Sequence, residues 1–329
     1  MEIRSETQLS AVADEVSALT AVVRPILEGT LYSLRKEVAE TLGGYDKITL
    51  FMLAATRNPG DGDCGISFEY AVHDAIARGE DSVLERVSDA LTQCKVTGDA
   101  KSILFGLEKT GAQLLIETAQ ETLTDASVLM SGRRGKPALL KPHLRSVAAA
   151  FRSPTAREAL PQSISGLWRA DLFVGATEVD RWVGATVKIN PKQLEGARGL
   201  RIGIVPETQG RSDAIQIDES KNLVICPIPY DEAFMETFYG GWQIVQTFLA
   251  AHAKLPKPVA LPYGAHRQVA RYLEERRDFP VVDVIEALAT LEQPNLLAGH
   301  ENVADVVPAL REAKDVVTSA FITPVPLQA

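Results

Sequence analysis

The chain has 329 residues, of which 46 % are apolar and 23 % charged, and its net charge is −9. This composition is ordinary for a globular protein and excludes disordered, collagen-like and disulfide-stapled chains. No apolar run reaches the roughly 18–20 residues that a membrane span requires, and the polar N-terminus lacks the apolar segment of a signal peptide. Three distant cysteines, Cys64, Cys94 and Cys226, predict free thiols in a reducing cytoplasm.

The N-terminal segment 7–43 has apolar residues at spacings of mostly three and four, which predicts a long helix. Pro25 should kink or split this helix, and Gly43-Gly44 should end it. The pattern suits two roles. The helical segment either packs on the core of its own chain or forms an arm through which the protein becomes a homodimer.

The rest of the chain changes from helical to β-type patterns near residue 170. Before that point, 47–56 predict a strand or a buried helix, 57–65 a loop, and 68–79, 82–94 and 101–123 helices. After it, short apolar runs predict strands at 170–175, 181–190, 200–206 and 222–228, and then a helix over 231–255 with Asp231 as its N-cap.

These elements predict an α/β protein with a mixed sheet of at least four strands, flanked by helices. We divide the chain into three regions: a helical arm at 1–45, an α/β core at 46–255 with a helical insertion at about 80–165, and a helical region at 256–329.

Two ionisable residues lie on the strands that the turn 176–180 joins. Asp171 starts the first strand and Lys188 ends the second, so an antiparallel hairpin brings both to one end of the sheet. There a carboxylate can hold Mg²⁺ or Mn²⁺, and a lysine can orient a water or stabilise charge developing on a phosphate. The hairpin thus indicates metal-assisted phosphodiester hydrolysis, unless both residues are ordinary surface groups.

With this hairpin the chain resembles the PD-(D/E)XK nuclease superfamily. That pattern has an acid on one strand, (D/E)-x-K on the next, and often a glutamate on a preceding helix. Asp171 matches the acid, Lys188 the lysine and Glu69 the helical glutamate. The elements near 69, 170, 182, 200 and 231–255 follow the αβββαβ order of the family. The resemblance implies a restriction-endonuclease-like fold and a Mg²⁺-dependent DNA endonuclease of restriction or phage defence, dimeric because both DNA strands are cut.

The sequence departs from the family at Thr186, two residues before Lys188, where the pattern has Asp or Glu. A carboxylate from elsewhere has to complete the metal site. Glu195, in the turn after the strand, and Glu69 are the candidates, which with Asp171 gives three predicted metal ligands.

Two other carboxylates, Glu178 and Asp180, lie in the hairpin turn, too far from the strand end to contribute. If no carboxylate compensates for Thr186, the chain is instead a non-catalytic nucleic-acid-binding or scaffold protein that keeps the fold.

A basic segment at 131–157 contains no carboxylate. Its cations are suited to contact DNA phosphates, which would make binding salt-dependent. The alternative is a solvated basic face that balances the acidic helices. The predicted DNA-contacting residues are Arg133, Arg134, Lys136, Lys141, Arg145 and Arg152.

Glu69 has a simpler explanation too, because the pattern puts it in the first turn of its helix, where the helix dipole favours a carboxylate. His73, four residues later, shares its face and either faces the same site or pairs with Glu69 at the surface. Cys64 has no placed histidine and is a poor candidate nucleophile.

Overall fold

The structure, a computed structural model, describes residues 6–104, 122–130, 137–146, 149, 153–159, 170–196, 199–208, 214–230, 233–255, 261 and 263–291. Within them the helices are α1 (Glu6–Tyr32), α2 (Lys36–Thr41), α3 (Leu50–Thr56), α4 (Asp61–Arg78), α5 (Asp81–Gln93), α9 (Pro154–Glu158), α10 (Ala233–Ala250), α11 (Gly264–Glu275) and α12 (Val281–Leu291). The strands are β1 (Ala100–Leu104), β2 (Val128–Leu129), β3 (Ala138–Leu139), β4 (Leu172–Ala176), β5 (Arg181–Val187), β6 (Arg201–Pro206), β7 (Gln216–Asp218) and β8 (Leu223–Ile228).

The described strands form one mixed sheet in the order β1-β4-β5-β6-β8-β7, with β2 and β3 attached beside β5. β4 and β5 form the expected antiparallel hairpin, in which Phe173 lies opposite Gly184. β5, β6 and β8 run parallel to one another. The prediction of an α/β protein with a mixed sheet is therefore confirmed.

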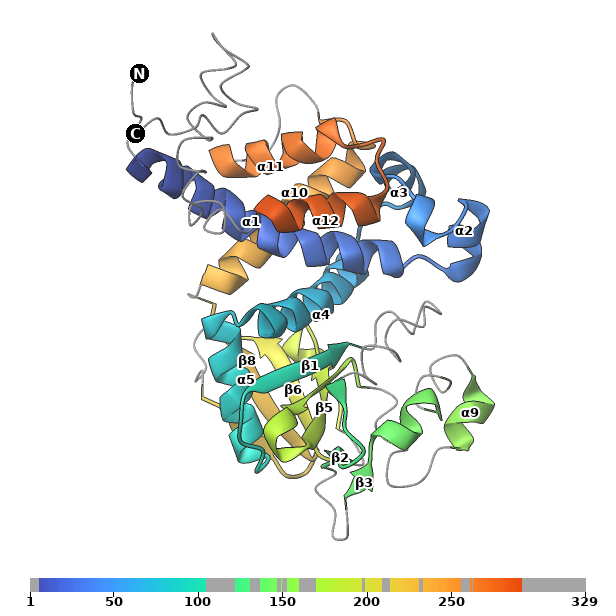
Figure 1. The fold of residues 1–329 in the computed structure, drawn as a ribbon, viewed down its shortest axis with the longest axis vertical. Coiled ribbons are helices and arrows are strands. Elements are labelled where there is room, and N and C mark those ends of the chain that lie inside the picture. Colours follow the sequence, from blue (N-terminus) through green and yellow to red (C-terminus); the bar gives the residue numbers. More distant parts are fainter. Residues whose placement is uncertain are drawn as a thin grey trace, which may run out of the picture.

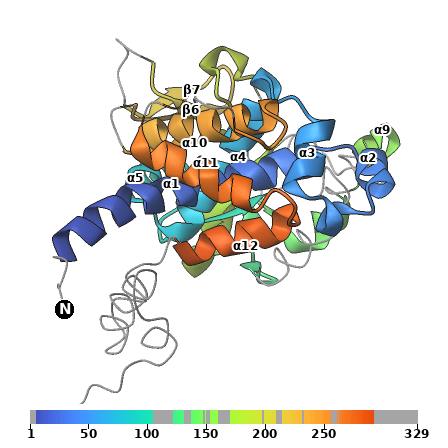
Figure 2. The same ribbon diagram turned by 90° about the horizontal axis from the view of Figure 1, so that it is seen from above.

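Most helices lie above the sheet in Figure 1, whereas α5 and α9 lie beside it. α4 and α5 pack against the strands, and α4 lies between the sheet and a second helical layer. That layer contains α1, α10, α11 and α12, which lie across one another when seen from above (Figure 2). One continuous cluster of buried apolar side chains runs from Leu19 to Leu288 and joins both helical layers to the sheet.

Of the two predicted effects of Pro25 on the N-terminal helix, a kink or a split, the split does not occur. α1 continues through Pro25, and the break comes at residues 33–35 instead. Proline removes one backbone hydrogen bond from a helix. The packing of Val23, Ile26 and Leu27, all fully buried, against the neighbouring helices offsets that loss. The described part of this apolar stripe therefore packs on the core of its own chain, which is the first of the two predicted roles.

The region around residue 100 corrects another expectation. We expected a helix at 101–123, but residues 100–104 form strand β1, which pairs antiparallel with β4. A short apolar run fits a helical or a strand period equally well, and here the open edge of β4 decides. The insertion at 80–165 is consequently not wholly helical, since β2 and β3 also lie in it. The run at 47–56 resolves as helix α3, capped by Thr49, whose side chain accepts a hydrogen bond from Met52 N.

The C-terminal region begins with helices, as expected, as far as α12. The predicted cap Asp231 lies outside the described residues. The pair Gly240-Gly241 allows α10 to approach α1 closely, because a Cβ on Gly241 would lie 3.2 Å from Ile26 Cδ1. No helix in the described ranges is long and apolar enough to cross a membrane.

Gly175 of β4 provides a test of the hairpin. A Cβ at this position would collide with the carbonyl oxygen of Arg181 and with the Trp182 ring. We expect Gly175→Ala to lower the free energy of unfolding by about 2 kcal/mol or more, because neither the backbone nor the buried ring can yield. Urea unfolding measures this. The control is Gly65→Ala in α4, where a Cβ meets nothing within 4 Å and should be neutral or stabilising by up to about 1 kcal/mol. Equal effects of the two substitutions would contradict the packing around Gly175.

Candidate functional site

The carboxyl ends of three parallel strands meet at one edge of the sheet. Lys188 follows β5, Glu207 follows β6, and Tyr230 comes shortly after β8. The edge is tied together by the backbone amide of Tyr230, which donates to Glu207 Oε2 at 3.2 Å. In open α/β sheets, ligands bind outside the carboxyl ends of the strands. Lys188 therefore lies where a site is expected on topological grounds.

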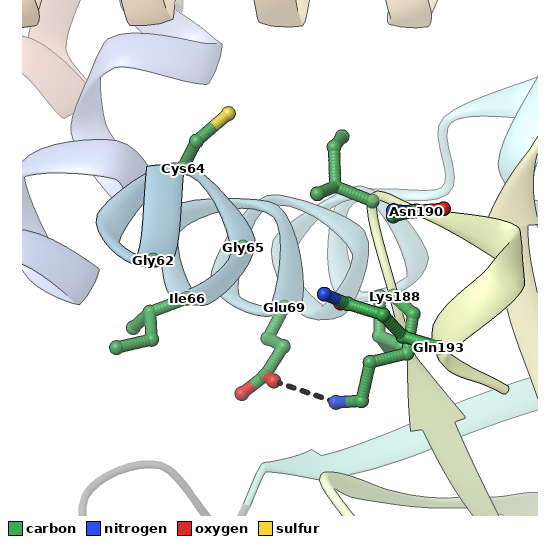
Figure 3. Close-up of a pocket in the computed structure, with 10 residues that line it drawn as sticks. Gly62, Cys64, Gly65, Ile66, Glu69, Lys188, Asn190 and Gln193 are labelled. Atoms are coloured by element: carbon green, nitrogen blue, oxygen red, sulfur yellow. Dashed lines mark hydrogen bonds and ion pairs between the residues drawn. The ribbon is translucent and has the colours of Figure 1, made fainter. Parts of the chain in front are cut away.

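The Lys188 ammonium bridges two carboxylates from different parts of the chain. Its Nζ lies 2.8 Å from Asp171 Oδ2 and 3.3 Å from Glu69 Oε1. Figure 3 shows the Glu69 side chain reaching from α4 to the tip of Lys188. The structure thus brings together three of the four predicted catalytic residues.

Asp171 is held by more than the ion pair. Its Oδ2 also accepts hydrogen bonds from Thr186 Oγ1 and Val187 N, both at 3.0 Å, and its own backbone amide donates to Ala185 O. Asp171 is only 5 % exposed. The carboxylate therefore continues the β4–β5 ladder beyond its last backbone pair. Thr186, where the family has an acid, serves as a donor to Asp171.

Glu69 corrects the argument from the helix dipole. α4 begins at Asp61, so Glu69 lies two turns into the helix, where the dipole has little effect. It is 8 % exposed, and a buried carboxylate needs a cation, which Lys188 supplies. Burial alone would lower the pKa of Lys188, but the charges of Asp171 and Glu69 outweigh it and raise that pKa above its ordinary value. Lys188 is therefore a charged ammonium at neutral pH.

Two hollows share Lys188 as a lining residue. The first has a volume of about 530 Å³ and is bounded by the start of α4 and by Glu69, Asn190 and Gln193. Figure 3 looks into it. The second, of about 450 Å³, is lined by Thr186, Lys188, Lys192, Gln193, Glu195 and Arg201. Strand alternation puts Thr186 on the sheet face opposite to Val187, whose side chain belongs to the core under α4. Lys188, at the strand end, reaches both hollows.

The remaining predicted carboxylates are placed by the hairpin and by the turn after it. Glu195 is exposed and lines the second hollow, as Lys188 does. The described ion pairs of Lys188 are those with Asp171 and Glu69. Glu178 and Asp180 lie at the other end of the hairpin, as expected. Asp180 Oδ1 there accepts hydrogen bonds from Thr124 and Ser127.

The predicted DNA-contacting residues are described only in part. Arg133, Arg134, Lys136 and Arg152 lie outside the described residues. Lys141 pairs with Asp125 at 3.5 Å, and Arg145 is exposed. Both follow β3, which joins the sheet through β2 at Arg181 and Trp182, the first residues of β5. Strand β3 therefore lies at the end of β5 opposite to Lys188, about 20 Å from it along a seven-residue strand.

His73 and Cys64 are separate from the Lys188 cluster. His73 Nδ1 makes a 2.7 Å hydrogen bond with Ser102 Oγ of β1, and burial lowers the pKa of His73 to about 4. It thus joins α4 to the sheet as a neutral ring and neither faces the ion pair nor pairs with Glu69 at the surface. Cys64 points away from the Glu69–Lys188 pair in Figure 3. All three cysteines are free, as expected, and buried.

The residues around Lys188 suit a magnesium ion in one respect. Mg²⁺ is usually held by one or two carboxylates, by waters and by substrate phosphates, not by a full cage of side chains. Glu69 and Asp171 supply two carboxylates that already converge on one positive group. Over the described ranges, no group of three or more His, Cys, Asp or Glu side chains is placed to hold a metal.

Sequence reasoning missed Lys192, Gln193 and Arg201 in the second hollow. Arg201 carries a usable signal, because it is a cation at the start of an apolar strand and is only 5 % exposed. Gln193 and Lys192 lie in a polar turn, which gives no such signal. Comparison of the chain with protein-family models, with curated proteins and with solved structures finds no match.

The ion pair predicts a pH-dependent stability defect in Lys188→Met. Removing the ammonium takes away the cation that both buried carboxylates face, which should cost about 2 kcal/mol at pH 8. In the folded variant these carboxylates favour the protonated form more than in the unfolded chain. Stability is then highest in mild acid and falls as the pH rises from about 4.5 to 8.

Urea unfolding across that pH range measures the effect. The control is Lys101→Met, an exposed lysine on β1, which should leave stability unchanged. Adding Glu69→Gln to Lys188→Met should recover part of the loss at pH 8. A defect that does not depend on pH would contradict the electrostatic explanation.

Proposed function

We propose that this protein hydrolyses phosphodiester bonds of DNA with a divalent metal ion, Mg²⁺ or Mn²⁺, at the carboxyl edge of β5. The observation that carries the proposal is the convergence of Glu69, Asp171 and Lys188, from a helix and two paired strands, between two hollows. Residues far apart in the chain meet here in the combination that such chemistry needs.

The order of elements supports a restriction-endonuclease-like fold in part. Along the main path of the sheet, α4 is followed by β1, β4 and β5, and the acid and the lysine lie on the β4–β5 hairpin. The sequence-based assignment takes the strands near residues 170, 182 and 200 as the three strands of the αβββαβ order. The structure has an additional strand, β1, before them. Between β5 and β6 the family pattern has a helix. The described residues there contain only the short 3₁₀ turn Pro191–Gln193.

Glu69 and Asp171 are the residues that would hold the metal ion. When bound, such an ion supplies charge against the oxygens of the reacting phosphate and a more acidic water. Lys188 now lies between the two carboxylates, so it has to move aside, and its side chain, 29 % exposed, has the two hollows beside it. From there it orients the attacking water or stabilises the negative charge that develops on the phosphate.

The second hollow supports an anionic substrate. Among the described residues, Lys188, Lys192 and Arg201 line it together with one carboxylate, Glu195. Three cations around one hollow favour a phosphate group. DNA remains the proposed partner. The homodimer through the N-terminal helix remains a prediction.

A second candidate function is a non-catalytic DNA-binding or scaffold protein. The observation that favours it is that Asp171 already has hydrogen-bond donors within the protein. Its Oδ2 accepts hydrogen bonds from Thr186 Oγ1, Val187 N and Lys188 Nζ. A carboxylate used in this way stabilises the hairpin without chemistry. Thr186 also leaves the second strand without the usual acid.

Cleavage of supercoiled plasmid and of single-stranded DNA, with Mg²⁺, Mn²⁺ or EDTA, tests the proposal. We expect metal-dependent cutting, lowered about 100-fold or more in Glu69→Gln and in Lys188→Met, because each removes a group from the reacting centre. Asp171→Asn should behave in the same way. Circular dichroism and urea unfolding confirm that each variant is folded.

The matched controls are Glu178→Gln, a carboxylate at the far end of the same hairpin, and Lys101→Met. Both should cut like the wild type. Salt-sensitive DNA binding without cutting would favour the second candidate. Cutting that survives in Glu69→Gln and Lys188→Met would place the chemistry elsewhere in the chain.

A further inference from the structure

A separate hollow of about 490 Å³ lies among α1, α10 and α11. Its lining differs in charge from the hollows at Lys188. Two carboxylates, Glu15 and Glu236, line it, and no lysine or arginine is among the described residues that do so. A negative potential in a concave site concentrates cations.

Three tyrosines give this hollow an aromatic wall. Tyr230 and Tyr263 are 44 % and 61 % exposed, so their rings are accessible from the hollow. Tyr230 lies 5.8 Å from Tyr239, and Tyr263 lies 5.1 Å from the ring of His266, measured between centroids. The faces of tyrosine rings attract ammonium and guanidinium groups.

His266 is a buried polar residue in the wall of this hollow. It is 8 % exposed, and its Nδ1 has no hydrogen-bond partner among the described residues. Burial lowers the pKa of His266 and nearby Glu15 offsets this only in part, so the ring is neutral at neutral pH. His266, which lines the hollow, is therefore a neutral ring with one nitrogen that can accept a hydrogen bond, and it adds no positive charge to the site.

Gly240 of α10 makes room for this ring. A Cβ at that position would lie 2.7 Å from His266 Nε2, closer than a Cβ approaches a non-bonded atom in proteins. The close approach of α10 and α11 therefore places the imidazole beside the carboxylate and tyrosine wall.

We propose that this hollow binds an organic cation, an alkylammonium or guanidinium group, held by Glu15 and Glu236 and stacked on the tyrosines. The same chemistry comes from two sources: a small polyamine, or a lysine or arginine side chain of another protein. Phosphate-bearing ligands are disfavoured by the two carboxylates. The proposal is independent of hydrolysis at Lys188.

Isothermal titration calorimetry in 150 mM salt tests it, with spermidine, a neutral-capped lysine-arginine peptide and adenosine as probes. We expect saturable binding of spermidine, of the peptide or of both, and the stronger of the two identifies the source. Glu236→Gln and Tyr263→Ala should each weaken that binding about tenfold, because each removes one charge or one aromatic face.

The controls are Glu275→Gln and Phe279→Ala, an exposed acid and an exposed ring outside the hollow, which should bind like the wild type. The proposal is overturned if neither cation binds, if Glu236→Gln and Tyr263→Ala bind as tightly as the controls, or if adenosine alone binds. Urea unfolding of each variant separates loss of binding from loss of folding.

Discussion

The buried carboxylate of Asp171 fixes the edge of the sheet at which the candidate site lies. One oxygen accepts hydrogen bonds from Thr186, Val187 and Lys188, three consecutive residues at the end of β5. Because the group is buried, it needs compensating charge, and the Lys188 ammonium supplies it. The same ammonium also compensates Glu69, so a single cation ties the hairpin to α4.

The ion pairs of Lys188 stabilise this edge of the sheet and also form the proposed metal site. Glu69 and Asp171 both face one ammonium, so under the proposed function a metal ion would take its place. A hollow lies on either side of Lys188. The same geometry explains why a purely structural ion pair is a serious alternative, since Thr186 leaves Asp171 satisfied without any ligand. What separates the two is whether Glu69 and Asp171 exchange Lys188 for a metal.

α4 connects the two halves of the molecule. Glu69 on this helix contacts Lys188 at the end of β5, and His73 contacts Ser102 of β1. The helix also packs against α1. The regions that we predicted as a helical arm and a helical C-terminal region therefore share one core with the sheet, as far as α12. Close packing of α10 through its glycine pair then shapes the acidic, tyrosine-lined hollow among α1, α10 and α11.

The sequence by itself determined the elements with strong local signals. The β4–β5 hairpin followed from two apolar runs around a polar turn, and the meeting of Asp171 with Lys188 followed from their positions at its ends. It could not determine strand β1, because a short apolar run takes whichever structure its neighbours complete. Only the tertiary structure decided that Glu69 reaches Lys188, that Thr186 donates to Asp171 and that Arg201 and Lys192 share a hollow. Those contacts join segments up to 119 residues apart, and their geometry is set by how α4 and the turn after β5 pack on the sheet, which no local pattern encodes.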